Sequence, residues 1–254
     1  INGFVFACFI WMTKSESLSW SFSQIPPSMQ DNFTCLRFAI TLMLSAMLME
    51  VCAQTQDAQL WSGIEIEQKF NKEHAAQLKT QFRLGDNFSR ADYSYVDLGY
   101  QYSPNKVIDA SAGYSLNMRN HYIRGWGSRH QWYTYVTITK KIGDLKIANR
   151  NQFQSDIEDA SQNEGSFFYR NRIQLRYKVN ETLTPFASAE GYLRLGQRPP
   201  NENFFYRTRY IAGLHFNISK RQRIELSYLL QRQIRRDVPD YIHAYCINYS
   251  ITLK

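Results

Sequence analysis

The chain is poor in cysteine, and this scarcity excludes several classes of protein. Four of its 254 residues are cysteines, and three of them, Cys8, Cys35 and Cys52, lie in an N-terminal part that is interpreted below as a leader. Only Cys246 remains beyond it, so that region can form no internal disulfide and has no cysteine-rich metal spacing. Its histidines are isolated rather than paired four residues apart, and we therefore expect neither a metal site nor a cofactor.

Long apolar runs are also missing from most of the chain. The mean hydropathy is −0.46, and no run of 18 apolar residues occurs after position 53. A membrane-spanning helix needs such a run, so spanning helices are excluded from residues 54–254. A β-barrel is not excluded, because its strands alternate apolar and polar residues and are polar on average.

The apolar stretch over residues 38–49 has the pattern of a secretory signal peptide. Arg37 precedes the apolar residues 38–49, and the sequence Val51-Cys52-Ala53 follows them. A basic residue, an apolar segment and small residues at the cut define such a leader. We expect residues 36–53 to be the signal peptide, with cleavage near Ala53 and residues 54–254 forming one β-barrel domain.

Residues 1–35 are interpreted as a disordered extension or as the product of a misassigned start, because Met29 lies at a normal distance before Arg37. The alternative that Phe4–Met12 is an anchor is disfavoured because the segment is too short to span a membrane. Cys52 could also indicate a lipoprotein, but Glu50 is poorly suited to such a site.

The segment 166–178 shows the pattern that decides the fold class. One parity carries Phe167, Tyr169, Ile173, Leu175 and Tyr177, with Asn171 as the exception, and the opposite parity carries four cations. Successive side chains of a strand point to opposite faces, so one face is apolar and the other is basic. The same alternation recurs in eleven segments: 59–70, 75–84, 91–103, 107–118, 128–142, 144–156, 165–178, 183–195, 204–217, 222–233 and 240–253.

The links between these segments alternate in length, which favours a transmembrane barrel over a soluble β-fold. Short links with turn-forming residues alternate with longer polar ones at 85–90, 119–127, 157–164, 196–203 and 234–239. We therefore predict an all-β, antiparallel, up-and-down transmembrane β-barrel of about 10–12 strands. Eleven would be odd, whereas bacterial single-chain barrels have even counts, so we expect ten or twelve.

Aromatic residues on the apolar parity form two groups that resemble the girdles of a membrane barrel. Aromatic rings prefer the headgroup region of a bilayer. One group lies beside short turns and the other beside long loops: Tyr102, Tyr177 and Phe216, then Trp132, Phe167 and Phe204.

Two short motifs carry a resemblance to a known family. At Leu60-Trp61-Ser62-Gly63-Ile64-Glu65 and at Tyr169-Arg170-Asn171-Arg172, the region 56–254 resembles a bacterial family catalogued as domain of unknown function 2490. The resemblance implies an outer-membrane-type barrel, mostly from Bacteroidetes-like bacteria. It implies no established activity and supplies no catalytic residues.

The polar parity predicts a lumen rich in arginine. An arginine-rich lumen favours anions, whereas a narrow barrel can instead be filled by side chains that pair with one another. The sequence leaves both a narrow anion-leaning passive pore and a closed structural barrel open. The candidate lumen charges are Arg170, Arg172, Arg176, Arg194, Arg207, Arg209, Glu190 and Glu225. The strongest candidates are Arg170, Arg172, Arg207 and Arg209, because only the strand with Glu190 and Arg194 separates the two strands that carry them.

An outer-membrane hydrolase with an active site at the rim is the alternative. His121, His130, His215 and His243 are available, with Ser128 close to His130 and Asp240 close to His243. No Gly-x-Ser-x-Gly motif occurs, so we expect the rim histidines to serve hydrogen bonding and the protein not to be an enzyme.

The charge balance points to the partners of the barrel. Residues 54–254 carry 28 Lys and Arg against 19 Asp and Glu, a net charge of about +9. A secreted chain of this charge meets anionic headgroups and solutes, so we expect a lipid bilayer, lipopolysaccharide and small anionic solutes as partners, and no nucleic acid. The sequence does not reveal the oligomeric state.

Overall fold

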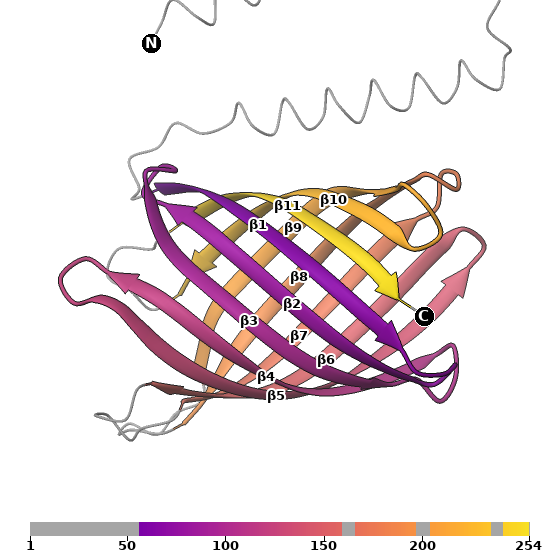
Figure 1. The fold of residues 1–254 in the computed structure, drawn as a ribbon, viewed down its shortest axis with the longest axis horizontal. Coiled ribbons are helices and arrows are strands. Elements are labelled where there is room, and N and C mark those ends of the chain that lie inside the picture. Colours follow the sequence, from indigo (N-terminus) through magenta and orange to yellow (C-terminus); the bar gives the residue numbers. More distant parts are fainter. Residues whose placement is uncertain (1–55, 159–165, 197–203, 235–240, 254) are drawn as a thin grey trace, which may run out of the picture. The chain divides into compact units, whose positions relative to one another are not determined.

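The computed structural model describes residues 56–158, 166–196, 204–234 and 241–253, and these residues form one closed β-barrel (Figure 1). Each strand pairs with its neighbours in sequence, and the first strand pairs with the last. The strands are β1 (Gln56–Lys69), β2 (His74–Gly85), β3 (Arg90–Tyr102), β4 (Ile108–His121), β5 (Gly125–Ile142), β6 (Leu145–Glu158), β7 (Ser166–Tyr177), β8 (Leu183–Leu195), β9 (Phe204–Asn217), β10 (Gln222–Gln233) and β11 (Tyr241–Leu253).

The alternation in the sequence becomes an apolar outer face and a polar inner face. On β7, Ile173 and Leu175 are 49% and 44% exposed on the outside, whereas Gln174 between them lines the lumen. The same arrangement holds on β4, where Ile108 and Met118 are exposed and Ser111 and Ser115 are buried. The predicted all-β barrel is confirmed, and each of the eleven predicted segments forms a strand.

The barrel closes with a parallel pair, and the expectation of ten or twelve strands is wrong. Strands β1 and β11 run in the same direction, in a register that extends from Gln56↔Tyr241 to Gln68↔Leu253. All other neighbouring strands are antiparallel. Parallel strands can also form a regular ladder of hydrogen bonds. The pairing of β1 with β11 therefore closes the barrel despite the odd number of strands, and neither strand is left with an open edge.

The link between β4 and β5 is much shorter than predicted. We expected a long loop over 119–127, but Arg119, Asn120 and His121 pair with Gly127, Trp126 and Gly125. The strands therefore continue beyond the apolar pattern and leave only residues 122–124 between them. Gly125 has a φ of 71°, a conformation that glycine adopts without steric cost and that permits the tight turn.

The short turns at the other end of the barrel are held by local hydrogen bonds. Asn71, Asn105 and Asn180 each accept two backbone N–H groups through the side-chain oxygen. Such Asx turns explain why asparagine recurs at these positions. In the turn after β7, the ammonium of Lys178 bonds to Glu181 and lowers the pKa of this exposed carboxyl group.

The outer face carries most of the predicted aromatic residues, with two differences. Tyr102, Tyr177 and Phe167 are between 40% and 52% exposed and lie near strand ends. Trp132 is exposed as well, but it lies well inside β5 because that strand begins at Gly125, and its ring packs on Tyr114.

A register shift changes the aromatic residue that faces outward at the start of β9. The shift lies between Tyr192 and Leu193 of β8, where Tyr192 pairs with Arg207 and Leu193 with Phe205. Phe205 is consequently 59% exposed on the outside. The side chain of Phe204, which we expected in this role, lies outside the described residues.

Three asparagines interrupt the apolar outer face in the middle of β6 and β7. Asn149, Asn151 and Asn171 form a closed hydrogen-bond network in which Asn171 donates to both of the others. The hydroxyl of Tyr169 donates to Asn151 at 2.6 Å. The exception noted in the sequence at Asn171 is therefore part of a polar cluster whose members satisfy one another.

The N-terminal predictions cannot be compared with the structure. Residues 1–55, which include the extension, the signal peptide and the cleavage position, lie outside the described residues, so these remain predictions. Within the barrel region that the structure describes, no helix has the length and apolar character required to cross a membrane.

Candidate functional site in the barrel lumen

The inner face encloses a cavity of about 680 Å³ whose lining is strongly basic. Ten lysine and arginine residues line it, against five aspartate and glutamate residues. The basic residues are Lys79, Arg83, Arg119, Arg124, Arg129, Arg150, Arg170, Arg172, Arg207 and Arg209, and the acidic ones are Asp92, Asp97, Asp156, Glu190 and Glu225.

Glu190 on β8 is the centre of the basic wall. Its carboxylate lies 2.9 Å from a guanidinium nitrogen of Arg170, 3.2 Å from Arg150 and 3.8 Å from Arg209. The Glu190 side chain is only 3% exposed, and those of its three partners are 13% to 18% exposed. One carboxylate therefore neutralises one of three largely buried cations, which leaves the group with an excess of two positive charges.

The ring of Tyr192 provides the surface on which this wall is assembled. The guanidinium carbons of Arg170, Arg207 and Arg209 lie 4.4 Å, 5.4 Å and 5.0 Å from the ring centroid. The Tyr192 hydroxyl donates to Glu190 at 3.1 Å and accepts from Arg209. Contacts between guanidinium groups and ring faces are attractive, and they hold like charges close together.

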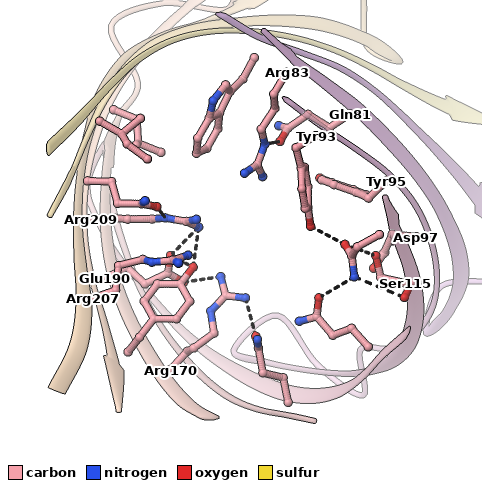
Figure 2. A pocket seen from close by; sticks show the side chains of 18 of the residues that line it. Gln81, Arg83, Tyr93, Tyr95, Asp97, Ser115, Arg170, Glu190, Arg207 and Arg209 are labelled. Atoms are coloured by element: carbon pink, nitrogen blue, oxygen red, sulfur yellow. Dashed lines mark hydrogen bonds and ion pairs between the residues drawn. The ribbon is translucent and has the colours of Figure 1, made fainter. Parts of the chain in front are cut away.

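Arg83 and Arg207 have no carboxylate partner among the described residues. Arg83 on β2 lies between two rings, 3.7 Å from the centroid of Trp61 and 4.3 Å from that of Tyr93, and its Nε donates to Gln81. Arg207 packs on Tyr192 and Tyr206, and its buried Nε has no hydrogen-bond partner in the residues that the structure describes. Figure 2 shows Arg83 and Arg209 pointing into one opening from different walls.

The opposite wall is built from tyrosines and polar side chains. Tyr133 of β5 crosses over Gly99 and Gly113, which form a cross-strand pair, and donates to Asp97 at 2.8 Å. A Cβ at Gly113 would lie 2.8 Å from the Leu98 carbonyl oxygen as well as against the Tyr133 ring, so glycine is required for this close approach. In Figure 2, Tyr93, Tyr95 and Asp97 face Arg170, Arg207 and Arg209 across the opening.

The other carboxylates of the lumen have partners of their own. Asp156 lies 3.8 Å from Arg129, and Glu65 lies 3.4 Å from Lys79. Glu225 contacts His215 at 3.0 Å. These acids are therefore not available to neutralise the arginines around Glu190.

The structure brings most of the predicted lumen residues together. Arg170, Arg172, Glu190, Arg207 and Arg209 line one cavity, because β8 lies between β7 and β9. Glu225 lines the same cavity.

Arg176 and Arg194 share the inward parity but are not among the lining residues, since they lie nearer opposite ends of their strands. Arg194 donates to Ser166, and the buried Nε of Arg176 has no partner in the described structure.

The histidines do not form a nucleophile–histidine–acid arrangement in the described residues. His130 bonds to the hydroxyl of Tyr114 and His243 to that of Tyr228, and these tyrosines lie on the outer parity. Ser227 and His215 both bond to Glu225, so the acid lies between them, whereas a catalytic triad places the histidine in the middle. His121 lines the cavity near the end of β4, and Asp240 lies outside the described residues.

Sequence reasoning missed the rings that organise the arginines. Trp61, Tyr93 and Tyr192 all lie on the inward parity of their strands and line the cavity. A usable signal existed at Trp61, which shares its parity with Glu65 and Glu67. In the part of the chain that the structure describes, no group of three or more His, Cys, Asp and Glu residues is placed to hold a metal ion.

Comparison with solved structures gives two distant similarities. The outer-membrane expressed OmpT of Vibrio cholerae has 13% identity and a TM-score of 0.37, over 63% of this chain and 54% of that protein. The NanC porin has 11% identity and a TM-score of 0.45, over 68% of this chain and 86% of that protein. The chain thus spans about half the length of OmpT.

Comparison with family models gives a match to the region that forms the barrel. No curated protein matches the chain. The model of the protein family of unknown function DUF2490 matches residues 58–241, which extend from β1 to the first residue of β11. This match covers most of the chain and agrees with the resemblance found in the two short motifs. The chain therefore belongs to the DUF2490 family.

Proposed function

We propose that this protein is an outer-membrane β-barrel that admits small anions through its lumen as a passive pore. The observation that carries the proposal is the excess of lumen cations over carboxylates, ten against five. A buried charge is costly unless it has a partner of opposite sign. Arg83 and Arg207 form no ion pair with a carboxylate among the described residues, and mobile anions would supply the missing charge.

The outer-membrane location rests on the outer face and on the predicted leader. The outward side chains are predominantly apolar, and aromatic rings such as Tyr102, Tyr177 and Phe167 lie near the strand ends. In water such a face would be unfavourable, whereas the hydrocarbon of a bilayer is compatible with it. Lipid and lipopolysaccharide are the partners proposed for this face.

Conductance in a planar bilayer tests the pore directly. The protein is expressed from the full chain, purified from membranes and inserted, and the reversal potential is measured in a potassium chloride gradient. We expect unitary steps and a reversal potential of the sign set by chloride. Arg172→Gln together with Arg207→Gln should roughly halve the ratio of chloride to potassium permeability, because lumen charge sets selectivity.

Lys72→Gln provides a control for loss of positive charge outside the lumen, since Lys72 lies in an exposed turn. It removes one positive charge and should leave the permeability ratio unchanged. Cation selectivity of the unmodified protein, or electrical silence of a barrel that still shows heat-modifiable migration in electrophoresis, would reject the pore. Silence would favour the closed structural barrel instead.

A further inference from the structure

Part of the inner wall is an apolar strip formed by four neighbouring strands. Such a strip is not expected in a water-filled lumen. It consists of Trp61 on β1, Ile211 on β9, Leu229 on β10, and Ile242, Ala244 and Cys246 on β11. Cross-strand pairing joins Trp61 to Cys246 and Leu229 to both Ala244 and Ile211. The lumen of a membrane barrel is ordinarily polar, so an apolar inner wall needs a specific explanation.

Packing accounts for only part of this apolar strip. Trp61, Leu229, Ala244 and Cys246 are at most 6% exposed and pack against one another. Ile211 and Ile242 are only partly buried, and both line the cavity. Their aliphatic surface faces the space in which solutes would move, and exposing such surface to water is unfavourable.

The apolar strip adjoins Arg83, which has no carboxylate partner among the described residues, and Arg209, which shares Glu190 with two other arginines. Trp61 belongs to the strip and also carries Arg83, whose guanidinium carbon is 3.7 Å from the ring centroid. The guanidinium of Arg209 approaches the same ring at 5.6 Å. Both faces of the Arg83 guanidinium are covered by rings, so an anion can reach it only at its edge. That edge is the side that binds carboxylate and phosphate through two parallel hydrogen bonds.

Arg207 adds a second cation that no described carboxylate neutralises. It packs on the Tyr192 ring, which Arg209 also contacts, so the two guanidinium groups lie beside the same ring. Within the described part of the chain its buried Nε lacks a hydrogen-bond partner, and a buried donor without a partner is unfavourable. An oxyanion between Arg83 and the pair Arg207–Arg209 would offset the positive charge that Glu190 leaves unneutralised.

We infer that the lumen binds an amphipathic organic oxyanion. Its carboxylate, sulfate or phosphate group lies on the edges of Arg83, Arg207 and Arg209, and its apolar body lies on the apolar strip at Ile211 and Ile242. The inference rests on the proposed function and narrows the anions that the lumen prefers. Inorganic anions would satisfy the arginines but would leave the apolar strip facing water.

Competition with the chloride current tests this preference in the unmodified protein. Acetate, butyrate and hexanoate are added to the conducting barrel, and the concentration that halves the current is determined for each. Hexanoate has four more methylene groups than acetate, and partial burial of these groups should lower the half-blocking concentration by at least about tenfold. Hexanamide has a similar apolar body without charge and should not block.

Two variants separate the apolar strip from the arginines. Ile242→Ser removes aliphatic surface that lines the cavity, so acetate and hexanoate should become more nearly equal while chloride selectivity persists. Arg207→Gln should weaken the block by both anions. Heat-modifiable migration checks that each variant is folded.

The outcomes distinguish the inference from the proposed function. Chloride selectivity with equal block by acetate and hexanoate overturns the inference and leaves the anion pore intact. Absence of conductance rejects the pore, and binding is then tested by thermal unfolding, since a ligand that binds only the folded state raises the midpoint. A shift with hexanoate but not with acetate or hexanamide would support the binding site, whereas no shift would reject it.

Discussion

The two faces of β7 differ in how they accommodate polar groups. On the inner face, Arg170 obtains a carboxylate, Glu190, and a ring, Tyr192, from the next strand. On the outer face, Asn171 has two other asparagines as partners, on the preceding strand. The inner face carries net charge because it encloses a shared space, whereas the outer face carries only neutral groups that satisfy one another. The predictions below test this difference from the largest expected effect to the smallest.

Glu190→Gln should have the largest effect, because it removes the carboxylate shared by Arg150, Arg170 and Arg209. Breaking a buried ion pair by removing one partner costs about 3–5 kcal/mol. We expect a loss of this order in the free energy of unfolding, measured in urea by tryptophan fluorescence of the barrel in lipid vesicles. Added phosphate should restore part of the loss by replacing the missing anion.

Glu65→Gln is the matched control, since Glu65 pairs with Lys79 at 3.4 Å but its side chain is 33% exposed. It should cost less than about 1 kcal/mol, as is usual for exposed pairs. Equal losses for Glu65→Gln and Glu190→Gln would show that the cluster around Glu190 contributes no more to the free energy of unfolding than an exposed ion pair does.

Leu175→Arg and Gln174→Arg form a pair that compares the faces of one strand. Leu175 is 44% exposed on the outer face, and Gln174 lines the lumen. An arginine on the lipid face costs about 2–4 kcal/mol near the middle of the bilayer, whereas lumen substitutions are tolerated. Leu175→Arg should therefore reduce the amount of heat-modifiable protein in the outer-membrane fraction far more than Gln174→Arg. Similar amounts of the two variants would contradict the assignment of the faces.

Asn171→Leu should have the smallest effect. It removes the amide that donates to Asn149 and Asn151, but it also replaces a polar group by an apolar one on the outer face. Side-chain hydrogen bonds within membranes contribute about 0.6 kcal/mol on average, so the two changes should nearly cancel. We expect the free energy of unfolding to change by less than about 1 kcal/mol. Asn171→Asp introduces charge at the same position and should cost more, and the reverse order would refute the account of the outer face.

The sequence predicts the strands well because most of them alternate strongly enough to indicate their two faces. The predicted segment 183–195 coincides with β8, and 204–217 coincides with β9. The lumen arginines could be grouped for the same reason. The parity of a residue gives the face on which it lies, and strands that follow one another in the sequence are neighbours in the barrel.

The sequence-based predictions missed features that depend on more than one strand. The register shift that turns Phe205 outward and the pairing that shortens the β4–β5 link depend on hydrogen bonds between strands. The stacking of Arg83 between Trp61 and Tyr93 joins three strands and leaves no periodic signal in any one of them. The odd strand count was visible as eleven segments, but a general preference for even barrels led to the wrong expectation.

The parallel closure of β1 with β11 has a consequence for the topology of the protein in a membrane. Gln56 begins β1 at the end of the barrel where the 86–89 link lies, and Leu253 ends β11 at the end with the Asx turns. In the proposed bilayer, polypeptide attached before Gln56 and polypeptide attached after Leu253 would emerge into different compartments. In an even-stranded barrel both ends of the domain face the same compartment. In this barrel a segment attached at either end would lie on its own side of the proposed bilayer.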